Sequence, residues 1–384
     1  MKKRDSEDLE SRYIPKQWVG CPLEAEYFGD DRKLSKREAK MASAKDRSKY
    51  KKTDREKFQS PKKIDKEKLL QGRVLSIESE GIVVEHEGKT IICKLRGLLK
   101  KEKNQAKNLV AVGDVVWFEN SVPGEGVIAH VDQRRSVLSR ADNLSRRKEQ
   151  VIAANIDQVI ITVSVVAPNL RPAIVDRYII AAHKGNMTPI IVVNKIDLLD
   201  DISIDPILRE NEKELFQDFL TAYQVAGLQV IPISATTGDG LETLKKAMEG
   251  KASVFSGQSG VGKSSLINAL TGLTLRIGKI VDRTNKGAHT TSTTQLLPLE
   301  QGGWCIDTPG IRSFGLWDLE RDEVEQYFTE IHEKGKKCRF PDCTHLQEEG
   351  CAVLSAVKRG KIAPMRYDSY QLLMETISQE HLRR

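Results

Sequence analysis

The segment that most restricts the fold is residues 257–264, which read Gly-Gln-Ser-Gly-Val-Gly-Lys-Ser. The short apolar run 253–255 precedes it, and residues 265–273 follow with helical periodicity. A glycine-rich loop between a strand and a helix turns backbone N–H groups toward phosphate oxygens. The sequence therefore predicts a P-loop α/β domain whose loop residues contact a nucleotide: Gly257, Gln258, Ser259, Gly260, Val261, Gly262, Lys263, Ser264 and Ser265. Lys263 is expected at the outer phosphates and Ser264 on Mg²⁺.

Two further motifs indicate which nucleotide is bound. Asn194-Lys195-Ile-Asp197 ends an apolar run, and a carboxylate at Asp197 can accept both the ring N–H and the exocyclic amine of guanine, a pair that adenine does not offer. Ser234 and Ala235 close another apolar run, and the Ala235 N–H is expected to address the guanine oxygen. These motifs favour GTP and GDP as ligands, although short polar motifs of this kind also arise by chance.

The last nucleotide motif is Asp307-Thr-Pro-Gly310, after the apolar run 302–306. An acid at a strand end can hold Mg²⁺ through water, and Gly310 can offer its N–H to the terminal phosphate. In a typical small GTPase the phosphate loop comes first and the guanine-reading motifs come last. Here the guanine-reading motifs come first, so the sequence predicts a circularly permuted GTPase domain whose usual termini are joined around residues 240–251.

The loop between the phosphate-binding helix and the next strand contains the candidate catalytic group. Ile311 follows Gly310 and cannot orient water, so another residue must do so. His289 is the candidate, and Thr291 or Thr290 can complete the Mg²⁺ shell. An ordinary polar loop is the alternative interpretation.

A cysteine-rich segment lies near the C-terminus. Cys338, Cys343, His345 and Cys351 fall within 14 residues. Three thiolates and one imidazole match a closed tetrahedral Zn²⁺ site with no position left for catalysis. Reduced cysteines without metal are the alternative. We expect one structural Zn²⁺ in a helical segment too short to have a large core.

The remaining chain divides by composition. Residues 32–63 contain 14 Lys or Arg against 4 Asp or Glu, a local +10 that exceeds the net +7 of the whole chain. Such a run is expected to be a disordered tail, either an RNA-binding arm or a solubilising segment.

Five short β-rich runs follow between residues 70 and 135 and predict a small barrel, OB-like or SH3-like. The expected domains are a tail at 1–66, an OB-fold barrel at 67–145, the GTPase domain at 146–320 and a zinc-binding helical domain at 321–384.

The apolar pattern of the sequence predicts neither a membrane-spanning helix nor a secretory signal. No stretch approaches about 18 apolar residues, the length of a membrane-spanning helix. The first ten residues contain early acids and no apolar run, unlike a secretory signal. We expect a cytoplasmic protein without membrane contact.

The motif order and ligand spacing over residues 68–380 resemble the ribosome-small-subunit-dependent GTPase family, known as RsgA or YjeQ. The resemblance implies GTP hydrolysis stimulated by the small ribosomal subunit during its late maturation, with contacts to rRNA. It also implies that His289, in the segment Gly287-Ala-His-Thr-Thr-Ser292, serves catalysis.

The functional hypothesis is a GTPase that binds the immature small subunit and leaves after hydrolysis, and that is monomeric off the ribosome. One alternative is an RNA-binding assembly factor that uses GTP only as a binding switch. Another is a permuted GTPase acting on the large subunit, in which the barrel and the zinc ligands have no obvious place.

Overall fold

The computed structural model describes residues 69–96, 109–122, 124–142, 145–201, 205–272, 294–307 and 319–382. Side chains are described within these ranges except at positions 121, 140–142, 145–150, 307 and 378–382. The chain divides into two units, Met1–Leu69 and Leu70–Arg384, and every helix and strand below belongs to the second. The expected tail and the candidates His289, Thr291 and Gly310 lie outside the described residues.

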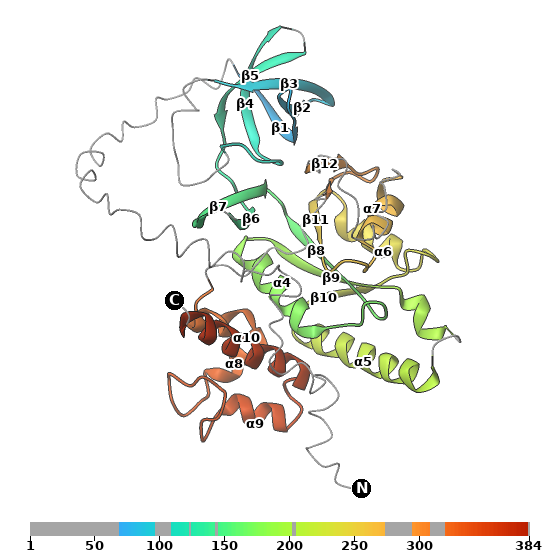
Figure 1. Cartoon of the computed structure of the whole chain (residues 1–384), viewed down its shortest axis with the longest axis vertical. Coiled ribbons are helices and arrows are strands. Elements are labelled where there is room, and N and C mark those ends of the chain that lie inside the picture. The colour runs from blue at the N-terminus through green and yellow to red at the C-terminus, as the bar shows by residue number, and fades with distance from the viewer. Residues whose placement is uncertain are drawn as a thin grey trace, which may run out of the picture. The chain divides into compact units, whose positions relative to one another are not determined.

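Five strands form the closed N-terminal barrel (Figure 1): β1 (Leu70–Ile77), β2 (Ile82–His86), β3 (Lys89–Leu95), β4 (Val115–Val122) and β5 (Glu125–Val131). Neighbours pair antiparallel except β3 and β5, which are parallel, and β4 returns to pair with β1. This order, 1-2-3-5-4-1, is that of an OB-fold and decides against the SH3-like alternative. The alternating burial of β1 directs Val74 into the core beside Val84 and Phe118.

The central domain contains a mostly parallel sheet in the order β10-β9-β8-β11-β13-β12. Its strands are β8 (Gln158–Ser164), β9 (Thr188–Asn194), β10 (Gln229–Pro232), β11 (Ala252–Ser256), β12 (Gln295–Pro298) and β13 (Trp304–Asp307). Only the edge pair β12–β13 of this set is antiparallel. β8 and β11 are buried along their whole length, because parallel strands are covered on both faces. The predicted α/β domain is confirmed.

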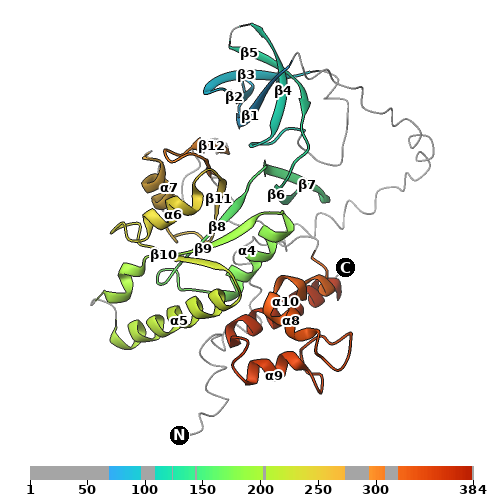
Figure 2. The same ribbon diagram turned by 180° about the vertical axis from the view of Figure 1, so that it is seen from behind.

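Helices cover both faces of this sheet. The apolar residues of α6 (Leu241–Met248) and α7 (Lys263–Thr271) share one core with Ile160 of β8 and Ile190 of β9. Successive strand residues point to opposite faces, so α4 (Pro172–Lys184), which also contacts β8 and β9, covers the other face. The long helix α5 (Pro206–Val225) lies beside β10 (Figure 2).

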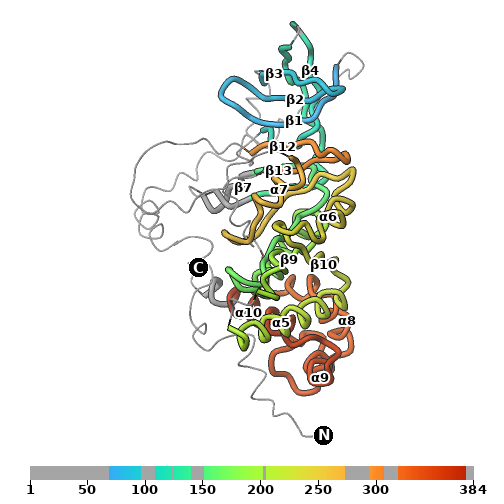
Figure 3. Tube along the Cα trace, turned by 90° about the vertical axis from the view of Figure 1, so that its right-hand side faces the viewer, coloured from blue at the N-terminus to red at the C-terminus, as the bar shows by residue number. Residues whose placement is uncertain are grey.

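Two connections between barrel and sheet were not expected from the sequence. The strands β6 (Val137–Asp142) and β7 (Ser145–Ala154) form a separate two-stranded ribbon. β7 begins with four charged residues among its first five, at 146–149, which hide the strand pattern. In addition, Ser76 of β1 pairs with Gln295 of β12 and joins the barrel to the sheet edge, as Figure 3 shows from the side.

The C-terminal segment is helical. It contains the short 3₁₀ turns η6 (Arg321–Glu323) and η7 (Glu325–Tyr327) and the helices α8 (Thr329–Gly335), α9 (Ala352–Lys358) and α10 (Pro364–Leu382). Its core includes Ile180 of α4, so this segment shares a core with the central domain. No helix within the described ranges is long and apolar enough to cross a membrane.

A buried arginine fastens the C-terminal helices to the central domain. Arg366 of α10 is 2% exposed and forms an ion pair with Asp176 of α4, which is 1% exposed. Its Nε also donates to Glu330 Oε1 of α8 at 2.6 Å. The guanidinium lies over the rings of Phe328 and Tyr223, at 4.5 and 5.1 Å from their centroids. One side chain therefore contacts α4, α5 and α8 at once.

We expect Arg366→Met to destabilise this junction strongly. The substitution leaves the Asp176 carboxylate buried without its cation, which costs about 3–5 kcal/mol. Urea unfolding followed by circular dichroism should show the loss. The control is Lys213→Met, which removes the exposed pair between Lys213 and Asp200 at 2.7 Å and should leave unfolding unchanged. Equal effects of the two substitutions would contradict the assigned role of Arg366.

Candidate functional site

The phosphate loop connects β11 to α7 and has the backbone that its glycines allow. Gly257 has φ +139, and a Cβ there would lie 2.0 Å from the Thr162 carbonyl oxygen of the neighbouring strand. Only glycine fits so close to β8. Lys263 opens α7, and its Nζ donates to the carbonyl oxygens of Gly257 and Gln258, at 2.7 and 2.5 Å. The loop thus surrounds the lysine at a helix N-terminus, an arrangement suited to anionic phosphates.

The Asn194 side chain connects this loop to the segments predicted to read guanine. Asn194 ends β9 and is 1% exposed. Its Nδ2 donates to Val261 O of the phosphate loop at 2.8 Å, and its Oδ1 accepts from Ala235 N at 3.1 Å. Gly262 has φ +95, and a Cβ there would lie 2.3 Å from Asn194 Nδ2. Three sequence motifs that are far apart in the chain therefore meet at one amide.

The loop after β10 is held by its own serine. Ser234 Oγ accepts hydrogen bonds from Thr236 N at 3.2 Å and from Thr237 N at 3.1 Å. Both contacts fold residues 234–237 into a turn that presents Ala235 beside Asn194. Because the Ala235 N–H already donates to Asn194, it can reach a guanine oxygen only as a shared donor.

Asp197 carries an acceptor without a partner at the same edge. It lies in the 3₁₀ turn η5 (Ile196–Asp200), directly after β9. Its Oδ1 is buried and has no hydrogen-bond partner among the described residues. Lys195 precedes it with φ +65, and its Nζ donates to Ala167 O, which holds the turn in place. Burial lowers the pKa of Lys195, and the neighbouring Asp197 opposes that shift.

The predicted nucleotide-contacting residues whose side chains the structure describes lie together at the carboxyl ends of β9, β10 and β11. Asp307 ends β13, the parallel neighbour of β11, so its backbone reaches the same edge. Its side chain lies outside the described set, as do Gly310, His289 and Thr291. Ligands of open α/β sheets bind at this edge.

The C-terminal cluster brings its four candidate ligands into one place. Their ligand atoms all lie within 4.8 Å of one another. Cys338 Sγ and Cys351 Sγ are 3.8 Å apart, and each lies 3.5 Å from His345 Nδ1. Tetrahedral Zn²⁺ with bonds of about 2.3 Å to sulfur and about 2.05 Å to nitrogen separates its ligands by about 3.8 and 3.6 Å. The donor set and its spacing therefore fit zinc.

Surrounding groups orient these ligands. The Ala352 N–H donates to Cys338 Sγ at 3.3 Å, and the Tyr367 hydroxyl donates to His345 O at 2.8 Å. His345 Nε2 faces Glu325 Oε2 at 3.4 Å but makes no hydrogen bond among the described residues. A carboxylate behind a ligating histidine is typical of zinc sites, because it orients the ring. Burial raises the pKa of the Cys343 thiol, so metal must displace a proton to bind there.

Two contacts of the candidate sites are not predicted by the sequence. Glu325 lies 13 residues before the first cysteine, and only the fold of η7 brings it behind His345. The bridging role of Asn194 was also not foreseen, since the motif marks the residue but not its contact with the phosphate loop. No periodicity or spacing signals either contact.

Comparisons with known proteins agree with this geometry. A family model described as RsgA GTPase matches residues 131–317. The small ribosomal subunit biogenesis GTPase RsgA of Chlorobaculum parvum is 38% identical over 320 residues, covering 81% of this chain and 99% of that protein.

Solved structures show the same fold. The crystal structure of YjeQ from Thermotoga maritima has a TM-score of 0.63 at 33% identity, over 80% of this chain and 98% of that one. The structure of YloQ, described as a circularly permuted GTPase, has a TM-score of 0.64 at 29% identity, over 81% and 96% of the two chains.

We expect the purified chain to contain about one zinc ion, and Cys343→Ser to lose it. Without metal, three buried cysteines and a histidine remain at the centre of a small core, so helices 319–382 should lose structure. Metal analysis and circular dichroism measure both effects. Cys305→Ser, which alters a buried cysteine of β13 outside the cluster, is the control and should keep the zinc. Full zinc content in Cys343→Ser would refute the ligand set.

Proposed function

The chain belongs to the RsgA GTPase family and is a GTPase, and from this premise we propose that it hydrolyses GTP on the small ribosomal subunit during late maturation. Its relative from Chlorobaculum parvum is named for biogenesis of that subunit. The subunit and its rRNA would be bound in the GTP state and released after hydrolysis. The protein would act in the cytoplasm, off the membrane, and as a monomer when free.

The observation that supports GTP most directly is the buried Oδ1 of Asp197, which lies beside Asn194 and has no hydrogen-bond partner in the part of the chain that the structure describes. A buried acceptor without a donor is costly, and guanine supplies two donors on one edge. Adenine does not present the same pair of donors. Asn194, Lys195, Asp197, Ser234 and Ala235 are proposed to hold the base. Because Asn194 also contacts Val261 O, base recognition and phosphate binding share one rigid frame.

The phosphates are assigned to residues 257–265. Lys263 would exchange its two carbonyl contacts for the outer phosphates, and Ser264 at the start of α7 would ligate Mg²⁺. When bound, Mg²⁺ neutralises charge that develops on the phosphate oxygens. Asp307 would support it from the end of β13, and Thr291 and Gly310 would complete the site at the terminal phosphate.

His289 is the proposed catalytic residue. Ile311 cannot orient water, and the family resemblance assigns this task to the loop histidine. His289 would hold the attacking water when the chain is bound to the subunit. The zinc cluster of Cys338, Cys343, His345 and Cys351 has a structural role in this proposal, since its four ligands leave no open position.

Base specificity tests the site without the ribosome. In Asp197→Asn, the amide can no longer accept from both guanine donors, and GTP affinity should fall by about 10- to 100-fold. Xanthosine triphosphate should bind the variant better than the wild type, because its second carbonyl accepts from the new amide. Isothermal titration with both nucleotides measures this exchange, and ATP is the control. If Asp197→Asn preferred GTP over xanthosine triphosphate as strongly as the wild type does, the assignment of Asp197 to base recognition would be wrong.

Turnover tests the partner. GTP hydrolysis should be slow alone, rise with small ribosomal subunits and stay low with large subunits. His289→Ala should lower the stimulated rate by about 10²- to 10⁴-fold while leaving the affinity for a non-hydrolysable GTP analogue unchanged. Stimulation by large subunits, or by neither, would refute the proposed partner. A variant that keeps its full stimulated rate would refute the role of His289.

A further inference from the structure

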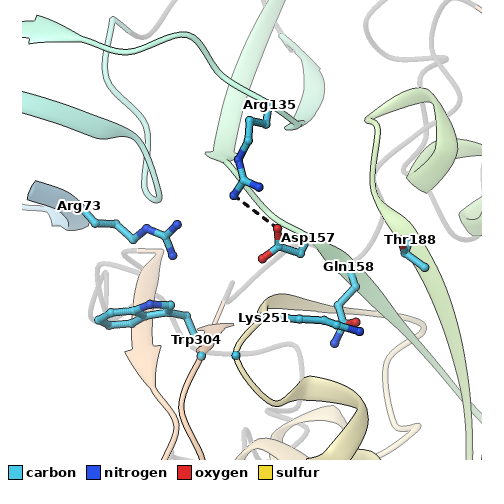
Figure 4. A pocket seen from close by; sticks show the side chains of 9 residues that line it. Arg73, Arg135, Asp157, Gln158, Thr188, Lys251 and Trp304 are labelled. Atoms are coloured by element: carbon cyan, nitrogen blue, oxygen red, sulfur yellow. Dashed lines mark ion pairs between the residues drawn. The ribbon is translucent and has the colours of Figure 1, made fainter.

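A cavity lies away from the nucleotide edge of the sheet. Its volume is about 450 Å³, within the range of about 300–1,000 Å³ that small-molecule sites occupy. Figure 4 shows its side chains around one opening. The lining residues come from the barrel, the β6 connection and the sheet: Arg73, Arg135, Asp157, Gln158, Thr188, Gly250, Lys251, Gly303 and Trp304.

This pocket sits at the amino edge of the parallel sheet. Gln158, Thr188 and Trp304 are the first residues of β8, β9 and β13, and Lys251 directly precedes β11. The phosphate loop begins at Gly257, six residues after Lys251 and at the other end of β11. At about 3.3 Å per strand residue, these two positions lie about 20 Å apart. The pocket is therefore distinct from the GTP site.

The charge of the lining favours an anion. Arg73, Arg135 and Lys251 stand against one acid, Asp157, which leaves a formal +2. Asp157 accepts from Ala252 N at 2.8 Å and pairs with Arg135 at 3.4 Å. Arg73 is half-buried and has no direct hydrogen bond or ion pair with any described residue. Burial lowers the pKa of Arg73 and the nearby Arg135 acts in the same direction, while Asp157 and Glu85 act against them. A bound anion would act in the same direction as these two carboxylates.

An aromatic side chain, Trp304, lines the pocket together with these cations. Trp304 is partly exposed, and its backbone N–H donates to Lys251 O at 2.9 Å. Gly303 has φ +89, and a Cβ there would lie 2.6 Å from the same oxygen, so only glycine lets the two segments approach. The backbone of residue 304 is therefore held at the pocket, where the indole is one of the lining groups. Indole faces beside cationic grooves are the platforms on which unstacked bases bind.

One lining residue, Gln158, also carries a buried acceptor. Gln158 is 1% exposed, and its Nε2 donates to Ala247 O and Ser253 Oγ, at 3.0 and 2.9 Å. Its Oε1 is buried and has no partner among the described residues. An exocyclic amine or ring N–H of a nucleobase is a donor of the kind that this oxygen lacks.

We propose that this pocket binds one unstacked nucleotide of single-stranded RNA, with its base on the Trp304 indole and its phosphates at Arg73, Arg135 and Lys251. The pocket offers cationic side chains for a phosphate, an aromatic face for a base and one acceptor for the edge of that base. Together these groups match a nucleotide better than they match a simple anion. The choice of RNA as the source of that nucleotide rests on the proposed function, which brings rRNA to this chain.

The test measures binding of the full chain to a labelled single-stranded RNA by fluorescence anisotropy. Trp304→Leu should weaken binding by about five- to 150-fold, the loss of one base–aromatic stack. Trp304→Phe keeps a ring and should stay within about threefold of wild type. An oligonucleotide with abasic sites keeps its phosphates but has no bases, so it should bind wild type and Trp304→Leu equally.

Charge is tested with a matched pair of barrel arginines. Arg73→Gln should reduce the slope of log K against log salt by about 0.7, the loss of one phosphate contact with a single strand. Arg96→Gln removes an equal charge outside the pocket, where Arg96 pairs with Glu119 at 3.2 Å, and should leave the slope unchanged. Thermal melts and zinc content check that each variant is folded.

Several outcomes would overturn the site. Equal affinities of Trp304→Leu and Trp304→Phe for RNA would contradict stacking of a base on Trp304. Equal salt slopes in the two arginine variants would contradict a phosphate contact at Arg73. Binding of free AMP or UMP that Trp304→Leu abolishes, with RNA binding unaffected, would assign the pocket to free nucleotides. If small subunits do not stimulate GTP turnover by the wild type, the proposed function is refuted but the RNA site is not. RNA binding is measured without subunits or GTP.

Discussion

The side-chain amide of Asn194 is the contact on which the nucleotide site depends. It joins the phosphate loop to the turn after β10 through two hydrogen bonds, from a position that is 1% exposed. A circular permutation changes the order in which these segments follow one another in the chain, but it leaves this contact possible. The permuted order is therefore compatible with the same site because the sheet, and not the chain order, brings the segments together.

A second buried polar contact joins the C-terminal helices to that sheet. Arg366 reaches Asp176 on α4, the helix that follows β8, and Ile180 of α4 belongs to the same core as the zinc-cluster helices. Burial tends to lower the pKa of Arg366, but the two carboxylates around it outweigh that effect and raise it. The helices around the candidate zinc cluster are thus joined to the nucleotide domain by the ion pairs of Arg366 with Asp176 and Glu330.

The central sheet offers different chemistry at its two edges. Its carboxyl edge carries the loops after β9, β10 and β11, together with Asp197, whose Oδ1 has no hydrogen-bond partner among the described residues. Its amino edge carries Trp304 and Lys251 beside arginines from the barrel and the β6 connection. β11 and β13 run directly between these edges. A ligand at the amino edge would therefore touch the same strands that present the phosphate loop and Asp307.

The sequence by itself determined the elements and the motif chemistry, because apolar runs, glycine positions and ligand types are local properties. It predicted all five barrel strands, the buried parallel strands and a cluster of four candidate zinc ligands, whose distances in the structure are compatible with the metal. The tertiary structure alone decided the OB-type closure, the β6–β7 ribbon, the Asn194 bridge, Glu325 behind His345 and the pocket at Trp304. Each of these joins residues distant in sequence, and no local pattern records such contacts, because they arise only when separate elements pack together.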